Sequence, residues 1–126
     1  MNIHDTYTEI FAGEYAQVWG GDVRVYDDAE SVVFQGEAQV NDGGRAIILF
    51  GAEGWAKLGG QIWVCKHGTG IVDTGGEAFV EAGSHMTVMP GGTVHQYSEE
   101  EWAEAAALTW RNAGGKASTF YFGEQQ

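Results

Sequence analysis

Short runs of alternating or β-rich residues, separated by glycine-rich turns, follow one another along most of the chain. We expect strands at Tyr15–Trp19, Asp22–Tyr26, Ser31–Gln39, Arg45–Phe50, Gln61–Cys65, Gly70–Val72, Ala78–Glu81, Met86–Met89 and Thr93–Tyr97. Turn signals fall between them, among them Gly20-Gly21, Asn41-Asp42-Gly43-Gly44, Gly59-Gly60, Asp73-Thr74-Gly75-Gly76 and Gly91-Gly92. No strand–helix–strand alternation is visible, so the pattern indicates an all-β sandwich or barrel.

The chain of 126 residues is expected to form a single domain, residues 1–126, which is long enough to bury a core. We find no internal repeat, low-complexity tract or linker, and residues 1–13 are expected to form an N-terminal arm. Twenty glycines with a single proline suit many tight turns. They argue against a helical bundle, because glycine costs about 1 kcal/mol at an interior helix position.

Charge and cysteine content restrict the partners and the compartment. The net charge is −12, with six Lys and Arg in total, so the surface repels phosphate backbones and anionic lipid headgroups. We therefore expect no nucleic-acid and no membrane partner; no apolar stretch is long enough to span a bilayer. The single cysteine, Cys65, excludes an intrachain disulfide, and the N-terminus lacks a secretory pattern. Both features favour a reducing, cytoplasmic setting.

Two segments carry the spacing of known metal-binding motifs. Pro90-Gly91-Gly92-Thr93-Val94-His95 reads P-x-G-x-x-H, and Trp55, Lys57 and Gln61 have the spacing of H-x-H-x-x-x-E. Together, over residues 46–97, these segments resemble the paired motifs of the cupin family, with three of the four metal ligands replaced. The resemblance implies a single-domain cupin-like β-sandwich or jelly-roll barrel that holds no metal and needs no cofactor. Cupins often dimerise, so the same resemblance suggests a homodimer.

The segment after Tyr97 gives conflicting signals. Ser98-Glu99-Glu100-Glu101 has the spacing of a capping box, and residues 102–108 are rich in helix formers, which predicts a helix from Glu99 to Leu108. The cupin resemblance instead implies a strand soon after the motif histidine. Following the resemblance, we expect a helical turn at Glu99–Trp102, a strand at Glu104–Arg111 and a last strand at Ser118–Phe122.

Side chains alternate between the two faces of a strand, so in a cupin-like barrel seven side chains of the segments described above would point into one chamber. Lys57, His95 and Tyr97 are the candidate catalytic residues, because a desolvated lysine and a histidine can exchange protons. Trp55, Gln61, Trp63 and Thr93 would line the chamber and hold the substrate. Lys57 could equally pair with an acid or bind a ligand carboxylate, and His95 could be hydrogen-bonded to Gln61 or Tyr97. Cys65 is expected to be a buried hydrophobe.

Three functions are consistent with such a chamber. The first is a metal-independent isomerase, cyclase or lyase that acts on a small aromatic or carbonyl-containing molecule by acid–base chemistry. The second is a non-catalytic small-molecule-binding protein, such as a sensor or accessory subunit. The third is a metallo-oxygenase with rearranged ligands His85, His95 and Glu77. The fold alone does not choose among them.

Overall fold

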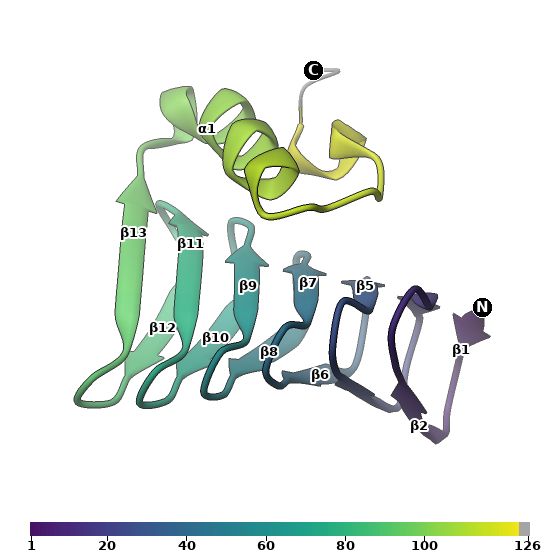
Figure 1. Cartoon of the computed structure of the whole chain (residues 1–126). Coiled ribbons are helices and arrows are strands. Elements are labelled where there is room, and N and C mark those ends of the chain that lie inside the picture. Colours follow the sequence, from purple (N-terminus) through teal and green to yellow (C-terminus); the bar gives the residue numbers. More distant parts are fainter. Residues whose placement is uncertain (124–126) are drawn as a thin grey trace.

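The computed structural model describes residues 1–123, which form thirteen short strands, one α-helix and one 3₁₀-helix. Every paired strand is parallel to its neighbour, and the strands make two sheets that face each other (Figure 1). In spatial order, the seven-stranded sheet contains β1 (Asn2–Ile3), β3 (Tyr15–Val18), β5 (Glu30–Val33), β7 (Arg45–Ile48), β9 (Gln61–Val64), β11 (Glu77–Glu81) and β13 (Thr93–Tyr97). The six-stranded sheet contains β12 (His85–Val88), β10 (Thr69–Val72), β8 (Glu53–Ala56), β6 (Glu37–Val40), β4 (Asp22–Val25) and β2 (Tyr7–Ile10). From β2 onward the chain alternates between the sheets, so each coil adds one strand to each, and the fold is a β-solenoid.

The expected cupin-like β-sandwich or jelly-roll barrel is therefore wrong, although the all-β prediction agrees with the two sheets. Jelly rolls are built from antiparallel strands, whereas here consecutive coils stack in parallel. Alternation of side chains and glycine at the turns are common to both architectures. Those signals predict strands without saying which strand pairs with which.

The expectation of no internal repeat is also wrong. Tyr7 pairs with Asp22 and Asp22 with Glu37, a spacing of 15 residues, whereas Glu37 pairs with Glu53 and Glu53 with Thr69, a spacing of 16. The added residue lies in the connection between the two sheets: three residues, 34–36, join β5 to β6, and four, 49–52, join β7 to β8. The change of spacing and the varied side chains hide the repeat from a simple reading of the sequence. The three-residue connection at 34–36 falls inside the single strand expected at Ser31–Gln39, so that segment is two strands and not one.

The apparent cupin motif is one of these repeated corners. Gly91 of Pro90-Gly91-Gly92 has φ 85°, and Gly43, Gly59 and Gly75 take the same left-handed conformation at the equivalent corners, with φ 82°, 77° and 80°. The corners stack directly, because the amide of Gly43 donates to the carbonyl of Gly59, Gly59 to Gly75, and Gly75 to Gly91. The glycines are thus required by the coil, and His95 follows them as an ordinary strand residue.

The two sheets differ in how many of their faces are covered. The six-stranded sheet alternates buried and partly exposed residues, because one face meets the core and the other meets water. In the seven-stranded sheet, all four residues of β5 and of β7 are buried. Its inner face contributes to the interior of the solenoid, with residues such as Val33, Ile48 and Val64, and its outer face lies under the C-terminal segment.

That cover is α1 (Glu99–Asn112), followed by η1 (Thr119–Phe122), which lies over the outer face of the seven-stranded sheet (Figure 1). Ser98 caps the helix through a complete capping box with Glu101. The strands expected at Glu104–Arg111 and Ser118–Phe122 are wrong. Local helix propensity and the cap determine the first segment, and the second is a turn of 3₁₀-helix capped by Ser118.

A buried ion pair ties the cover to the solenoid. The Arg45 guanidinium lies 3.0 Å from the Glu30 carboxylate, and both side chains are almost completely buried. Arg45 also donates to the carbonyl of Ala113 at 3.2 Å. Glu30 accepts from the backbone amides of Lys116 at 2.8 Å and Ala117 at 3.0 Å. These bonds connect β5 and β7 to the chain between α1 and η1.

We expect two glycine substitutions to have different costs. A Cβ on Gly60 would lie 2.1 Å from the Val40 carbonyl oxygen, so Gly60→Ala must displace the stacked backbone and should cost several kcal/mol. Gly51 has φ 80° with nothing within 4 Å of an added Cβ, so Gly51→Ala should cost only about 1–2 kcal/mol. Urea unfolding measures both, and equal losses would contradict the stacked-corner explanation.

Removing the buried cation should destabilise the protein strongly. Arg45→Met leaves the Glu30 carboxylate buried without its counter-ion, which typically costs about 3–5 kcal/mol of unfolding free energy. Arg24→Met is the matched control, because the Arg24–Asp22 pair is more exposed and should contribute about 1 kcal/mol or less. Denaturant unfolding followed by tryptophan fluorescence tests the difference, and similar midpoints would contradict it.

Candidate functional site

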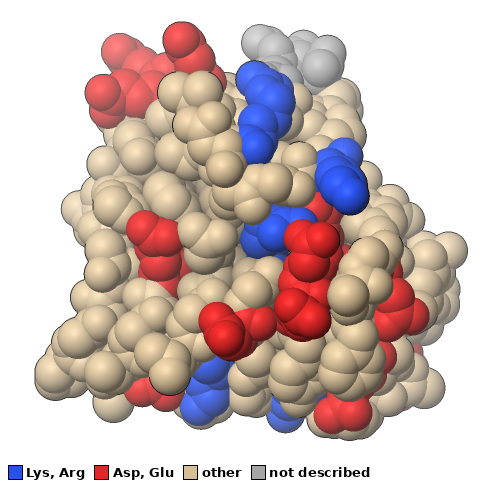
Figure 2. Space-filling view, viewed as in Figure 1, with Lys and Arg blue, Asp and Glu red and all other residues tan. Residues whose placement is uncertain are grey.

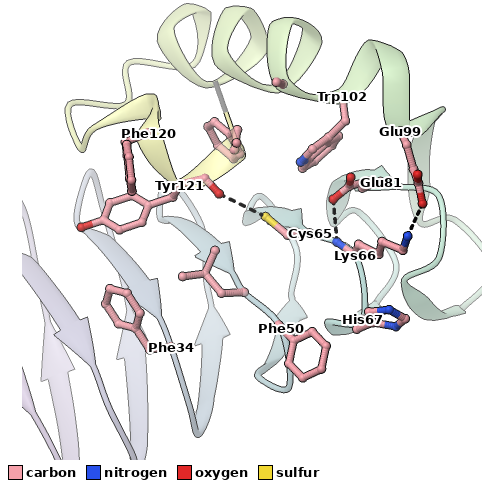
Figure 3. Close-up of a pocket in the computed structure, with 14 residues that line it drawn as sticks. Phe34, Phe50, Cys65, Lys66, His67, Glu81, Glu99, Trp102, Phe120 and Tyr121 are labelled. Carbon is pink, nitrogen blue, oxygen red and sulfur yellow. Dashed lines mark hydrogen bonds and ion pairs between the residues drawn. The ribbon is translucent and has the colours of Figure 1, made fainter. Parts of the chain in front are cut away.

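A groove of about 660 Å³ lies between the corners of the solenoid and the C-terminal cover. Figure 3 shows its two sides, with Phe34, Cys65 and Lys66 from the solenoid and Trp102 and Tyr121 from the cover. The groove exists because α1 and η1 cross the outer face of the seven-stranded sheet near the ends of its strands. It is larger than the hollow of about 580 Å³ at the last coil.

One row of stacked residues forms the solenoid side. Phe34, Leu49 and Cys65 each directly follow a strand, and their backbone amides donate to Val18, Val33 and Ile48 one coil earlier. The row begins outside the groove at Trp19, whose ring stacks on Phe34 with the centroids 3.9 Å apart. The stacking of coils thus produces a continuous apolar wall at this edge of the sheet.

Cys65 and Trp102 meet at the inner end of the groove. The Cys65 thiol is 8% exposed and donates to the Tyr121 carbonyl at 3.8 Å. Burial raises the pKa of this thiol to about 12, the charge of Glu81 adds to the effect, and the Trp102 indole opposes it. The Trp102 Nε1 atom is buried and has no hydrogen-bond partner among the described residues, and it faces Cys65 in Figure 3. The thiol is therefore neutral, and the indole N–H is directed at it without making a hydrogen bond of normal geometry.

Charged groups of both signs form the rim. The Lys66 ammonium pairs with Glu99 at the start of α1, and the Lys66 backbone amide donates to Glu81 at 2.7 Å. Partial burial raises the pKa of Glu81, and the bond from the Lys66 amide opposes that rise. The contact with Lys66 lowers the pKa of Glu99. The Lys66 ammonium is thus paired with Glu99, and Glu81 is bonded to the backbone of the same residue.

Aromatic rings flank the mouth of the groove. Phe50 and Phe120 are 71% and 55% exposed, which is high for large apolar side chains. His67 packs edge-on against Phe50, with the ring centroids 5.1 Å apart. Tyr121 lies edge-on to Phe34 at 5.7 Å, joining the two sides of the groove. The mouth therefore presents aromatic surface from both the solenoid and the cover.

Side-chain hydrogen bonds hold the cover in position above the groove. The Trp63 indole of β9 donates to Thr109 of α1 at 2.9 Å, and Gln17 donates to the Tyr121 hydroxyl at 3.2 Å. Within the cover, the Trp110 indole donates to the Ala117 carbonyl at 3.2 Å. Both long faces of the groove are thus attached to each other by specific bonds.

Two residues expected in a common chamber lie instead on the solvent face around the six-stranded sheet. Trp55 is on the outer face of β8, and Lys57 follows β8 at the corner. The Lys57 ammonium lies 4.1 Å from the centre of the Trp55 ring and 3.2 Å from the Asp73 carboxylate. This arrangement is a surface ion pair with a cation–π contact.

The other expected site residues lie on the outer face of the seven-stranded sheet. The rings of Trp63 and Phe79 stack at 4.8 Å, and Phe79 and His95 stack at the same distance. Glu77 accepts from Gln61 at 2.8 Å and bonds His95 Nε2 at 2.8 Å. The structure therefore brings Gln61, Trp63 and His95 together through Phe79 and Glu77, of which only Glu77 was considered from the sequence, as a metal ligand.

Thr93 and Tyr97 flank His95 on β13. Thr93 is exposed and lies beside Glu77 in register, whereas Tyr97 lies 6.2 Å from Trp102 between ring centroids. Lys57, on the other sheet's side, does not share this face. The described residues form two parallel sheets and not a barrel around a chamber, and the acid–base roles assigned to Lys57, His95 and Tyr97 stay predictions.

Among residues 1–123, no three or more His, Cys, Asp or Glu side chains are grouped so as to hold a metal ion. The combination of His85, His95 and Glu77 is divided between the two sheets, since His85 lies on β12. Neither helix in this range is long and apolar enough to cross a membrane.

The motif reading missed the residues that form the groove. Phe34, Leu49 and Cys65 follow successive strands of one sheet at spacings of 15 and 16 residues. Aligning the chain on its glycine corners would have placed them in one row. Nothing in the local sequence indicates that Trp102 and Tyr121 face that row, because this depends on how the cover packs.

Comparison with protein-family models, curated proteins and solved structures gave no match for this chain. The site is therefore interpreted from its geometry alone.

We expect the Cys65 thiol to be unreactive in the folded protein. With a pKa of about 12, only about one thiol in ten thousand is ionised at pH 8, and the thiolate is the reacting form. Labelling with iodoacetamide at pH 8 should be slower than in 6 M guanidinium chloride by at least about a hundredfold. Equal rates under both conditions would contradict the burial of this thiol.

Proposed function

We propose that the protein is a non-catalytic small-molecule-binding protein whose groove takes a neutral, planar aromatic molecule that carries one hydrogen-bond acceptor. The observation that carries this proposal is the groove itself: about 660 Å³, with aromatic and apolar walls from both the solenoid and the cover. Small-molecule sites have this size and combine an apolar lining with a few polar groups.

The walls favour a flat ring. Phe34 and Tyr121 meet edge-on inside the groove, and Phe50 and Phe120 present exposed rings at its mouth. A planar aromatic ligand can stack on or lie edge-on to these rings, and each such contact contributes about 0.5–1.5 kcal/mol beyond the buried area. Binding would also remove exposed apolar surface from water.

The polar groups favour a neutral ligand with an acceptor. The Lys66 ammonium is already paired with Glu99, so it is not free to pair with an anionic ligand. The buried Trp102 N–H has no partner among the described residues, and a buried donor left unpaired costs about 1–3 kcal/mol. A carbonyl oxygen inserted beside Cys65 would satisfy that donor.

Binding, and not covalent chemistry, fits the residues present in the groove. Its only thiol belongs to Cys65, whose raised pKa keeps it protonated and poorly nucleophilic. The Lys66 ammonium is held as a charged partner of Glu99, which further raises its pKa. A protonated amine is not a nucleophile.

Coumarin, a planar aromatic carbonyl compound, is a suitable probe. In ¹H–¹⁵N spectra it should shift the Trp102 indole signal and the backbone amides of Phe120 and Tyr121. Phe120→Ser should weaken binding about threefold to tenfold through the loss of one ring contact. Phe11→Ser is the matched control, because Phe11 is 51% exposed but lies on the first coil, outside the groove.

A second comparison tests whether the acceptor of the ligand bonds the Trp102 N–H. Trp102→Phe keeps an aromatic ring and removes the N–H, so it should weaken coumarin binding while leaving the binding of naphthalene, which has no acceptor, nearly unchanged. Trp55→Phe is the control, since the Trp55 N–H is also buried without a partner in the described chain but lies on the six-stranded sheet. Saturable binding that is insensitive to both Phe120→Ser and Trp102→Phe would overturn the proposal.

A further inference from the structure

The solenoid has an open end at its last coil. In Figure 1, β12 and β13 are the final strands at one end of the molecule, and each is bonded to a neighbour on one side only. An edge strand leaves alternate backbone N–H and C=O groups without a partner in its sheet. Both edges lie at the same end, so they can be paired together by a single partner.

The apolar interior is exposed at this end and closed at the other. Ile10, Val25, Val40, Ala56, Val72 and Val88 occupy the same inward position in successive coils. The first five are 0% exposed, including Ile10 in the first coil, whereas Val88 in the last coil is 47% exposed. Met86 and Val94 are also only partly buried against the core. Within residues 1–123, the last coil therefore lacks the layer that covers the coils before it.

A cavity of about 580 Å³ opens at the same end. It is lined by Val80 and Met86 from the two sheets and by Gln96 and Tyr97 from β13, so it extends from the core to the surface. Such a cavity can accept a side chain from whatever covers this end. The helix α1 does not fill this role, since it turns back over the outer face of the seven-stranded sheet (Figure 1).

The charge distribution indicates which molecule covers the last coil. Residues 82–98, which form the last coil, contain no Asp, Glu, Lys or Arg, although the chain carries 18 acidic residues. In Figure 2 the left edge of the molecule, over β13 and below the acidic start of α1, shows neither red nor blue, although acidic side chains lie just to its right. Two molecules of net charge −12 repel each other over most of their surfaces. The uncharged coil is where two copies can meet with least repulsion.

We propose that the last coil is a dimerisation surface on which a second copy of this chain docks, last coil against last coil. A two-fold axis would pair the free edges in antiparallel fashion and cover the open interiors of both copies at once. Head-to-tail stacking fits less well, because the first coil already buries Ile10 and carries Glu9 and Glu14. The two-fold contact uses up the edges of β12 and β13 in both copies, so it cannot repeat and stops at a dimer.

Sedimentation of the whole chain over a range of concentrations tests this interface. The wild type should form a dimer and no larger species. Val88→Glu places a charge on both sides of the contact and should raise the dimer dissociation constant at least about tenfold. Leu108→Glu is the matched control, because Leu108 is 55% exposed on α1, away from the last coil, and should leave the dimer intact.

Cross-linking of cysteine variants provides a second test that does not depend on Val88→Glu folding. Val88→Cys should give a covalent dimer with a flexible bismaleimide, whereas Leu108→Cys should give little. Cys65 is buried and protonated, so the wild type serves as the unreactive background. In head-to-tail stacking, residue 88 of one copy would face the first coil of the next, and the Val88→Cys dimer would not form.

A wild type that remains monomeric at millimolar concentration would overturn the proposal. So would a continuous series of species larger than a dimer, or a dimer that Leu108→Glu weakens and Val88→Glu does not. Ligand binding in the groove and dimerisation through the last coil are tested by different variants, so a result against one proposal does not affect the other.

Discussion

The stacking of each coil on the one before it is the constraint on which the molecule depends. Parallel pairing brings equivalent residues of successive coils into contact, so a single inward row such as Val25, Val40 and Val72 makes a continuous core. The corners must stack as well, and left-handed glycines such as Gly59 and Gly75 allow their amides to bond coil to coil. A coil cannot bury its apolar residues alone, so stability accumulates from neighbour to neighbour.

The difference between the two sheets explains where the groove lies. The outer face of the six-stranded sheet meets water. The outer face of the seven-stranded sheet instead carries a second apolar layer, which includes Val32, Ile47 and Trp63 and requires a cover. The C-terminal segment supplies it and is fixed by the Glu30–Arg45 pair. A helix laid across the ends of stacked strands cannot follow their edge closely. The space left at that edge is lined by the residues that follow each strand.

The groove and the open end lie next to each other in the molecule. Glu81, at the end of β11, lines both the groove and the cavity at the last coil. Its pKa is raised by partial burial, with a further contribution from the charge of Glu99. A partner seated on the last coil would therefore alter the surroundings of a residue that also contacts the groove. This adjacency gives ligand binding and self-association a direct physical route by which to influence each other.

The sequence by itself determined the local structure. Alternation located most of the strands, glycine pairs marked the corners, and the Ser98–Glu101 capping box correctly indicated a helix that the cupin resemblance argued against. Pairing was decided only by the tertiary structure, because period-two alternation is the same in parallel and antiparallel sheets. The P-x-G-x-x-H match arose from a repeated corner, so His95 reached the outer face and not a chamber. The groove was hidden for the same reason: its two walls, at Cys65 and Trp102, meet only when the cover packs on the stacked coils.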